Sequence, residues 1–347
     1  MKNVPGAFPG FRRYSESMRP NTARTVPASA LPASALSVSA LSVSALPRPL
    51  DFNVPSNRTA VYGAALFGAL ALLLGRGWRQ ALGVGGSSLL AWATGRELDP
   101  DSPASAAVAL GLAGITGLAQ IGKNQTGQDQ RTQAQAAQVQ TGQDQSRQSR
   151  GAAAPAILPG LAALSAVRLL SGTVGYAATR PDTLALSVQA GAAALAGYPV
   201  AAALPAAALV LSAAEQDALR PHAEWGAALA LGAGLLPQVF GHKKAGAGAG
   251  SAGRQLPSTL LSLGAISLGQ TLTAAEEPLS QCDQVPLTVS ASRLRASRVM
   301  GLGALAAGLL RGESASLVPL AAACLGTGLR RSLSGHSRLG LSRRAVA

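Results

Sequence analysis

The stretch Trp92-Ala-Thr-Gly-Arg-Glu-Leu-Asp-Pro-Asp-Ser-Pro103 separates two long runs rich in Ala, Leu and Gly. Its three acids, Glu97, Asp99 and Asp101, form the densest acidic group in a chain that is otherwise basic. Pro103 suits the first turn of a helix, and the serine before it can cap that helix. The stretch therefore predicts a loop between two apolar helices.

The composition of the whole chain indicates contact with lipid. Of its 347 residues, 48% are hydrophobic and 13% are charged, whereas a soluble domain usually carries about 25% charged residues. The formal charge of +14 comes mainly from arginines in the tails and in short gaps between apolar runs. A membrane protein places its cations there, whereas a nucleic-acid binder gathers them on one face with stacking aromatics. We therefore predict no nucleic-acid partner.

Nine apolar runs follow one another along the chain. Several approach the roughly 20 residues that cross a bilayer. The run 183–213 is too long for one straight crossing, and Pro199 and Pro205 are expected to break it in two. The predicted fold is an all-α polytopic transmembrane bundle of about eight to ten helices in hairpin-like pairs. The runs cover about 59–74, 81–94, 103–121, 152–178, 183–213, 225–240, 258–273, 299–310 and 315–329.

Small residues in one of these runs indicate how the helices pack. The run 81–94 is diluted by several glycines and serines, which let helix backbones approach closely in lipid and also suit contacts between copies of the chain.

Residues 303–312 match residues 68–77 at most positions, and Arg180-Pro-Asp182 resembles the end of the acidic stretch. Duplication of a helical hairpin and chance similarity in an Ala/Leu-rich chain both explain these matches.

Three polar segments divide the chain. Residues 1–56 contain five-residue repeats (PASAL, SVSAL), a period that fits neither a helix nor a strand. We interpret them as a disordered extension, a transit-like targeting peptide or the product of a start placed too far upstream. A Gln-rich linker, 123–151, separates a first membrane helix group, 57–122, from a second, 152–331, and a basic tail, 332–347, follows.

The charge distribution also predicts an orientation. The tail carries four arginines beyond residue 330 and no acid, so the positive-inside rule places it in the cytoplasm. With the Gln-rich linker inside as well, the acidic stretch lies outside, and the second half fits only if 258–273 does not cross. We expect a multi-pass protein of the bacterial inner membrane.

The acidic stretch is the first element of a candidate polar site. Several carboxylates close together are typical of Mg²⁺ or Ca²⁺ ligands, so Glu97, Asp99 and Asp101 are candidates for a metal site. The alternative is a solvated turn whose acids cap the next helix and pair with Arg96. Asp182, in the similar Arg-Pro-Asp corner, joins the candidates.

Arg168 is the second element, because it lies within an apolar run. A cation there costs about 2.5 to 3.5 kcal/mol on insertion scales. No acid lies within a helical turn of it, so its partner must come from another helix or from a ligand such as a lipid phosphate. Alternatively, the helix begins later than the run suggests and Arg168 extends to an interface.

The motifs of common soluble enzymes are missing from the sequence. It has no Gly-rich phosphate loop, nucleophile elbow or zinc-protease motif, and its two cysteines and three histidines are isolated. The favoured function is a non-catalytic carrier or membrane scaffold without a cofactor, whose partners are the bilayer, anionic lipid and further copies of the chain.

Two other classes of protein remain as hypotheses. A membrane-embedded enzyme acting on a lipid-phosphate or polyprenyl substrate would use the acidic stretch to bind Mg²⁺ and Arg168 to contact the anion. It requires those acids, Asp182 and Arg168 to converge, whereas a scaffold predicts that they point apart. A soluble Ala-rich helical protein is the third class.

Overall fold

The computed structural model describes residues 52–136, 157–215, 217, 219, 224–239 and 255–344. These residues form helices and no strand, apart from an isolated antiparallel bridge between Gln281 and Thr288. The all-helical fold predicted from the sequence is confirmed for this part of the chain. The predicted N-terminal extension up to residue 51, and residues 137–151 of the predicted linker, lie outside the described residues.

Eleven helices occur in the described residues, against the eight to ten predicted. The additional element is α9, a five-residue helix directly after α8. As predicted, the run 183–213 divides before Pro199, but Pro205 lies inside α6 and does not end it. The helices are α1 (Pro55–Leu73), α2 (Trp78–Leu98), α3 (Pro103–Ala136), α4 (Ile157–Ser171), α5 (Arg180–Leu195), α6 (Pro199–Ala214), α7 (Glu224–Val239), α8 (Leu256–Ser267), α9 (Gly269–Thr273), α10 (Ala291–Arg311) and α11 (Val318–Arg344).

The third helix extends further than the sequence pattern predicted. The apolar pattern ends near Ile121, yet the helix continues to Ala136 through the first part of the Gln-rich segment. Gln, Lys and Arg have good helix propensity, so a helix that is already nucleated can continue through them without an apolar face.

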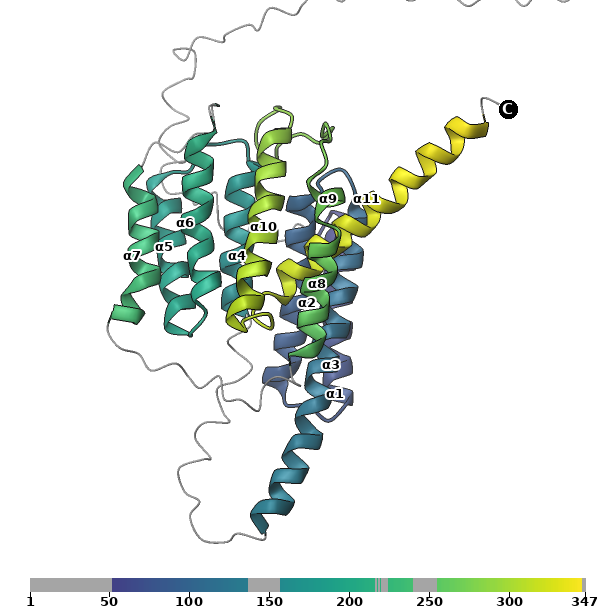
Figure 1. The fold of residues 1–347 in the computed structure, drawn as a ribbon, viewed down its shortest axis with the longest axis vertical. Helices are drawn as coiled ribbons and strands as arrows, with labels where there is room; N and C mark the ends of the chain where they lie inside the picture. The colour runs from purple at the N-terminus through teal and green to yellow at the C-terminus, as the bar shows by residue number, and fades with distance from the viewer. Residues whose placement is uncertain are drawn as a thin grey trace, which may run out of the picture. The chain divides into compact units, whose positions relative to one another are not determined.

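The helices run up and down the bundle (Figure 1), which brings four polar connectors to one end. We call this end, formed by residues 97–101, 168–182, 212–215 and 274–298, the charged end. The turns after α1, α5 and α10 lie at the other end, which we call the opposite end. The pair α8–α9 leads from the opposite end, where Ser258 contacts Ser314 at 3.1 Å, to the charged end.

Helix α4 occupies the centre of the bundle. It packs against α2 on one side, against α5 and α6 on the other, and also against α10 and α11. Eleven of its fifteen residues are buried. Any polar residue on α4 must therefore find its partner on a neighbouring helix.

Small residues bring the neighbouring helices into close contact. A Cβ atom added at Gly85 of α2 would lie 2.8 Å from the carbonyl oxygen of Ala64 in α1. At Gly326 of α11 it would lie 2.8 Å from the carbonyl oxygen of Ser105 in α3. Backbones this close leave room only for glycine, which agrees with the small-residue packing predicted for α2.

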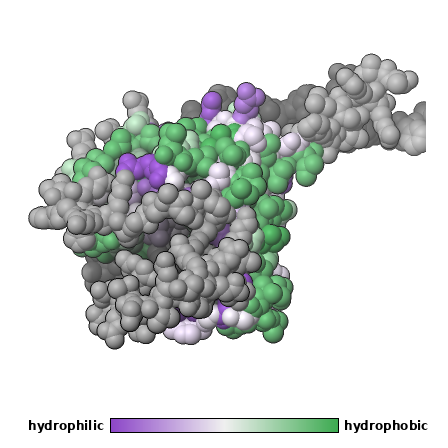
Figure 2. Space-filling model, turned by 60° about the horizontal axis from the view of Figure 1, so that its bottom comes forward, coloured by the Kyte–Doolittle hydropathy of each residue, from purple (hydrophilic) through white to green (hydrophobic). Residues whose placement is uncertain are grey.

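Large apolar side chains lie on the outside of the bundle. They cover much of the described surface in Figure 2, and Leu184 and Val188 of α5 are 63% and 64% exposed. The interior consists mainly of Ala and Leu, together with Gly, Ser, Val and several buried arginines and acids. Exposed examples occur on most helices: Leu66, Leu82, Ile115, Leu158, Leu184, Val188, Leu195, Val210, Leu229, Leu231, Leu260, Leu263, Val299 and Leu310.

By length and hydropathy alone, one helical segment among the described residues is long and apolar enough to cross a membrane. It is Pro103–Gln120 of α3, of which 39% is buried inside the bundle. Four further apolar helices are shorter: Ile157–Ser171, Pro199–Ala214, Gly226–Leu235 and Leu256–Ser267. This criterion supports one crossing segment of the eight to ten predicted.

Candidate functional site

Arg168 lies in the last turn of α4, not in the middle of a long apolar helix as the sequence pattern suggested. The helix stops at Ser171 because the chain turns at Gly172 and Gly175, whose φ angles of +68° and +88° favour glycine. The Arg168 side chain is 11% exposed, so it does not extend to solvent at an interface.

The buried partner of Arg168 is Glu97 of α2. The Nη1 atom donates to Oε1 of Glu97 at 2.5 Å, and the hydroxyl of Thr173 donates to the other carboxylate oxygen. Both ionic side chains are about nine-tenths buried. An acid from another helix therefore neutralises Arg168, which was one of the two sources of a partner expected from the sequence.

A second acid, Asp283, contacts the same guanidinium from the α9–α10 connector. Its Oδ2 atom accepts from Nη2 of Arg168 at 2.8 Å, and its side chain is 49% exposed. The backbone N–H of Asp283 donates to the carbonyl oxygen of Thr173 at 2.8 Å. Arg168 thus joins the ends of α2 and α4 to the α9–α10 connector.

The acidic stretch is not the solvated turn proposed as the alternative to a metal site. Glu97 and Asp99 are 7% and 1% exposed. Asp99 accepts from Nε and Nη2 of Arg330 at 3.0 and 2.7 Å, whereas Arg96 is half-buried and forms no ion pair with another described residue. The expected pairing with Arg96 is wrong because α10 and α11 cover this corner and α11 supplies its own arginine.

Asp101 is the exposed member of the stretch, and it holds two connectors together. It accepts backbone N–H groups of Leu279 at 3.0 Å and Ser280 at 2.7 Å, and the Ser280 hydroxyl. Partial burial raises the pKa of Asp101, but these hydrogen bonds outweigh that effect and hold the pKa below its usual value. Its oxygens therefore fix the α9–α10 connector against the α2–α3 connector.

Asp182 has a local role at the start of α5. It forms a capping box with Thr179, whose backbone N–H donates to Oδ2 of Asp182 at 2.8 Å. Such a box satisfies amides that a helix leaves without partners in its first turn. Among the candidate residues, the structure brings Glu97 and Arg168 into contact, whereas Asp99, Asp101 and Asp182 are each bound to other groups.

A second buried arginine, Arg293 of α10, was not singled out from the sequence. Its side chain is 1% exposed and donates to both carboxylate oxygens of Asp217, at 2.5 and 2.7 Å, and to the Ser212 hydroxyl at 2.9 Å. These hydrogen bonds from Arg293 hold the pKa of Asp217 below its usual value. One feature of the sequence indicated this pair: Arg293 and Asp217 each lie next to an apolar run, and therefore near a predicted helix end.

Three arginines surround Glu276 in the α9–α10 connector. Arg331 forms an ion pair with it, and the Nη2 atoms of Arg298 and Arg330 lie 3.5 and 3.6 Å from its oxygens. Arg298 also donates to the carbonyl oxygen of Leu98 at 2.9 Å. These contacts join the end of α2 to α10 and α11.

Five arginines and five carboxylates in the described residues therefore pair at the charged end. We call this set the charged network: Arg168, Arg293, Arg298, Arg330 and Arg331 with Glu97, Asp99, Asp217, Glu276 and Asp283. Numbers of opposite charge are equal, so the network is neutral when all members are ionised. Its geometry suits structural cross-linking of helix ends.

The same geometry is unfavourable for a metal site. No group of three or more His, Cys, Asp or Glu residues that could hold a metal ion occurs in the described part of the chain. Within the predicted site, Glu97 and Asp99 already accept from arginines, which would repel a divalent cation. No family model matches the sequence, and no curated protein or solved structure matches it either.

Proposed function

We propose that the chain is an integral membrane protein with a non-catalytic scaffold function. Its outward helix faces contact lipid, and the charged network joins the helix ends at one membrane surface. The bilayer is its principal partner, and no cofactor is required. This proposal rests on one observation, which is the distribution of large apolar and charged side chains between the outside and the inside.

The bundle has an apolar core, but its many exposed large apolar side chains and its buried charges are both unfavourable in water. Leu73 and Leu310 are 82% and 90% exposed, whereas Arg293 is fully buried. In water, burying a Leu or Val side chain stabilises a protein by about 1.5 to 3 kcal/mol, and an exposed side chain does not make this contribution. In lipid the same exposure carries no such cost, and helices associate through small residues and polar contacts instead.

Helix lengths are compatible with a bilayer. Helices α1, α2 and α10 have 19, 21 and 21 residues, which corresponds to about 30 Å at 1.5 Å per residue. The shorter helix α4 is surrounded by other helices, so lipid need not match its length.

The two ends of the bundle have features typical of membrane interfaces. At the opposite end, Trp78 is 64% exposed and the Arg79 guanidinium lies 5.3 Å from the centre of its ring. A cation beside an amphipathic aromatic is typical of the headgroup region. The connectors and paired charges of the charged end suit the other headgroup layer.

The orientation that we propose differs from the one expected from the sequence. Helix α11 passes the charged end at Arg330 and leads to the basic tail. A cytoplasmic tail therefore implies a cytoplasmic charged end, including the acidic stretch. Helix α3 ends on the other side of the membrane. The pair α8–α9 runs between the two ends of the bundle, so in this orientation the segment 258–273 crosses the membrane, whereas the sequence-based orientation required that it did not. The proposed location remains the bacterial inner membrane.

A scaffold agrees better with the polar contacts than a membrane-embedded enzyme or a carrier does. The lipid-phosphate enzyme requires carboxylates available for Mg²⁺, but Glu97 and Asp99 bind arginines and Asp101 binds backbone amides. A carrier typically has polar groups lining a cavity near the middle of the bilayer. The charged network instead lies at one end of the helices.

Alkaline carbonate extraction of membranes tests the proposal. The full chain, expressed with an epitope at its C-terminus, should remain in the membrane pellet while peripheral proteins dissolve. Protease treatment of inverted vesicles should remove the epitope, and treatment of intact spheroplasts should not. Recovery of folded chain in the soluble fraction without detergent would overturn the proposal and favour a soluble helical protein.

A further inference from the structure

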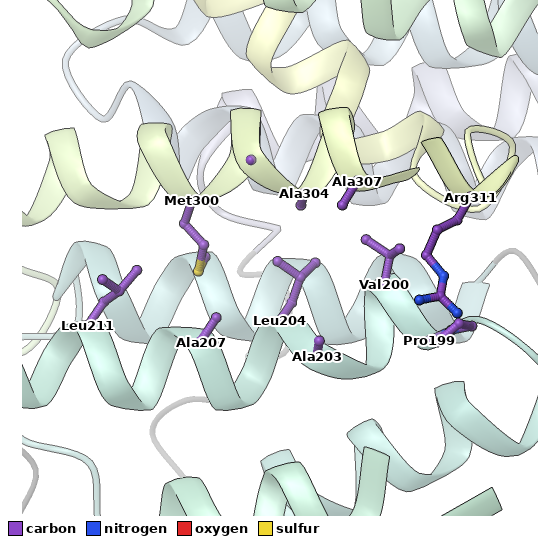
Figure 3. Close-up of a pocket in the computed structure, with 11 residues that line it drawn as sticks. Pro199, Val200, Ala203, Leu204, Ala207, Leu211, Met300, Ala304, Ala307 and Arg311 are labelled. Carbon is purple, nitrogen blue, oxygen red and sulfur yellow. The ribbon is translucent and has the colours of Figure 1, made fainter. Parts of the chain in front are cut away.

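A long apolar groove lies between α6 and α10. It has a volume of about 450 Å³ and runs from Pro199 to Leu211 along α6, a distance of about 18 Å at 1.5 Å per residue. Met300 of α10 lies opposite Ala207 of α6 across it, and Leu204 of α6 lies opposite Ala304 of α10 (Figure 3). The groove is therefore long and lined mainly by aliphatic side chains.

Small residues on α10 create this space. Gly303 lies on the groove, and a Cβ atom added there would meet nothing within 4 Å. The next residues along the groove are Ala304 and Ala307. A larger side chain at position 303 would therefore enter the groove without pressing on the surrounding backbone.

A cation lies at one end of the groove. Arg311, the last residue of α10, has a side chain that is 51% exposed, and its guanidinium lies beside Pro199 in Figure 3. Its Nε atom is 3.5 Å from Glu313, a long contact. The other oxygen of Glu313 accepts the backbone N–H of Val200 at 3.0 Å, so this acid also binds the start of α6.

We propose that the groove binds one acyl chain of an anionic phospholipid, with the lipid phosphate on Arg311. An aliphatic channel that ends at a half-exposed guanidinium matches an amphiphile with an anionic head. Arg311 belongs to the opposite end, where headgroups lie if the chain spans a membrane, and basic pockets between membrane helices bind such headgroups. This inference rests on the proposed membrane location and specifies the lipid partner.

Native mass spectrometry of the full chain in mild detergent tests the inference. The protein is titrated with phosphatidylglycerol and with phosphatidylcholine that carries the same acyl chains. We expect the anionic lipid to bind about fivefold more tightly, because one arginine near an anionic headgroup contributes a binding free energy of about 1 kcal/mol. Arg311→Gln should remove this preference and leave phosphatidylcholine binding unchanged.

A second variant tests the groove itself. Gly303→Phe should fill it and abolish binding of the first lipid of either type. Gly111→Phe is the matched control, because a Cβ atom at this glycine of α3 also meets nothing within 4 Å, and it should bind lipid as the unmodified chain does. Equal binding by Gly303→Phe and the unmodified chain, or a preference that survives Arg311→Gln, would overturn the inference.

Two further results separate this inference from its rivals and from the proposed function. If the chain is a dimer that Gly303→Phe converts to a monomer, the groove holds a second copy and the lipid inference is wrong. If carbonate extracts the chain from membranes, both the proposed function and this inference are wrong. A chain that resists carbonate but binds lipid independently of Gly303 and Arg311 overturns the inference alone.

Discussion

The two ends of the helical bundle are held together by different forces. At the charged end, five arginines and five carboxylates pair between helices and connectors. The opposite end relies on short turns at Gly75, Gly197 and Gly312, which have positive φ angles, and on a few contacts such as Glu313 with the backbone N–H of Val200.

This difference follows from the length of the connections. The connections 74–77, 196–198 and 312–317 at the opposite end are short, so each limits the distance between two helix ends by its own geometry. The α9–α10 connector is longer and has no regular secondary structure, so it needs contacts such as Asp101 with Ser280 and Asp283 with Arg168. Breaking single polar contacts should therefore destabilise the charged end more than the opposite end.

The largest effect is expected for Arg168→Leu, which leaves the Glu97 carboxylate buried without its cation. Loss of one member of a buried ion pair typically costs about 3 to 5 kcal/mol. Thermal unfolding of the detergent-solubilised protein measures the loss. The double variant Arg168→Leu with Glu97→Leu should recover part of it, because both buried charges are then absent. Equal stability of Arg168→Leu and the unmodified chain would contradict the structural function of the pair.

A slightly smaller effect is expected where helices touch through glycine. Gly326→Ala places a methyl group 2.8 Å from the Ser105 carbonyl oxygen and should destabilise the fold by about 1 to 3 kcal/mol through overpacking of α3 against α11. Gly303→Ala, which has open space around it, is the control and should be neutral or slightly stabilising. Equal unfolding temperatures for the two variants would refute this packing.

The pair of Asp217 and Arg293 should give the charged end a dependence on pH. Because the folded pKa of Asp217 is lowered, its contribution is fully present above the unfolded pKa of about 3.9. The contribution is lost as the pH falls through the lower folded pKa. Since a third of the Asp217 side chain is exposed, Asp217→Asn should cost only about 1 to 2 kcal/mol at neutral pH.

Unfolding measured between pH 7 and pH 2 checks this expectation. The unmodified protein should lose more stability on acidification than Asp217→Asn does, so the two curves should converge at low pH. Parallel curves would show that the Asp217 carboxylate does not contribute through its charge.

The smallest effect is expected for Glu313→Gln at the opposite end. The amide oxygen of Gln can still accept the Val200 N–H group, so the change removes the negative charge that makes the long contact with the half-exposed Arg311. The guanidinium of this pair is half-exposed and the contact is long, so we expect it to contribute about 0 to 1 kcal/mol, as surface ion pairs do. A loss comparable to that of Arg168→Leu, measured by the same unfolding experiment, would contradict the proposed difference between the two ends.

Local features of this fold could be predicted from the sequence, whereas its contacts could not. The apolar runs predicted helices, and Pro199 marked a boundary that the structure confirms. Arg168 stood out because a cation in an apolar run needs a partner. Its acid, Glu97, lies 71 positions away, and only the packing of α2 on α4 determines that choice.

The arginines of α10 and α11 show the same limit. In the sequence, Arg293 resembles an ordinary connector cation, because nothing local shows that α6 ends beside it. Asp99 and Arg330 are 231 positions apart, and their contact made a corner that looked solvated into a buried one. Ion pairs between distant residues depend on which helix ends lie next to each other in the fold. The spacing of apolar residues along the sequence does not contain that information.

Reaction with a polar, membrane-impermeant maleimide tests the central claim, that the apolar outer surface faces lipid, most directly. Cys282 and Cys324 are first replaced by Ala, and single cysteines are then introduced as Val188→Cys, on the exposed face of α5, and Glu277→Cys, in an exposed connector. In lipid vesicles open to the reagent on both sides, we predict that Glu277→Cys reacts and that Val188→Cys remains protected for as long as the bilayer surrounds the protein. Equal reaction at the two positions in intact vesicles would contradict the claim.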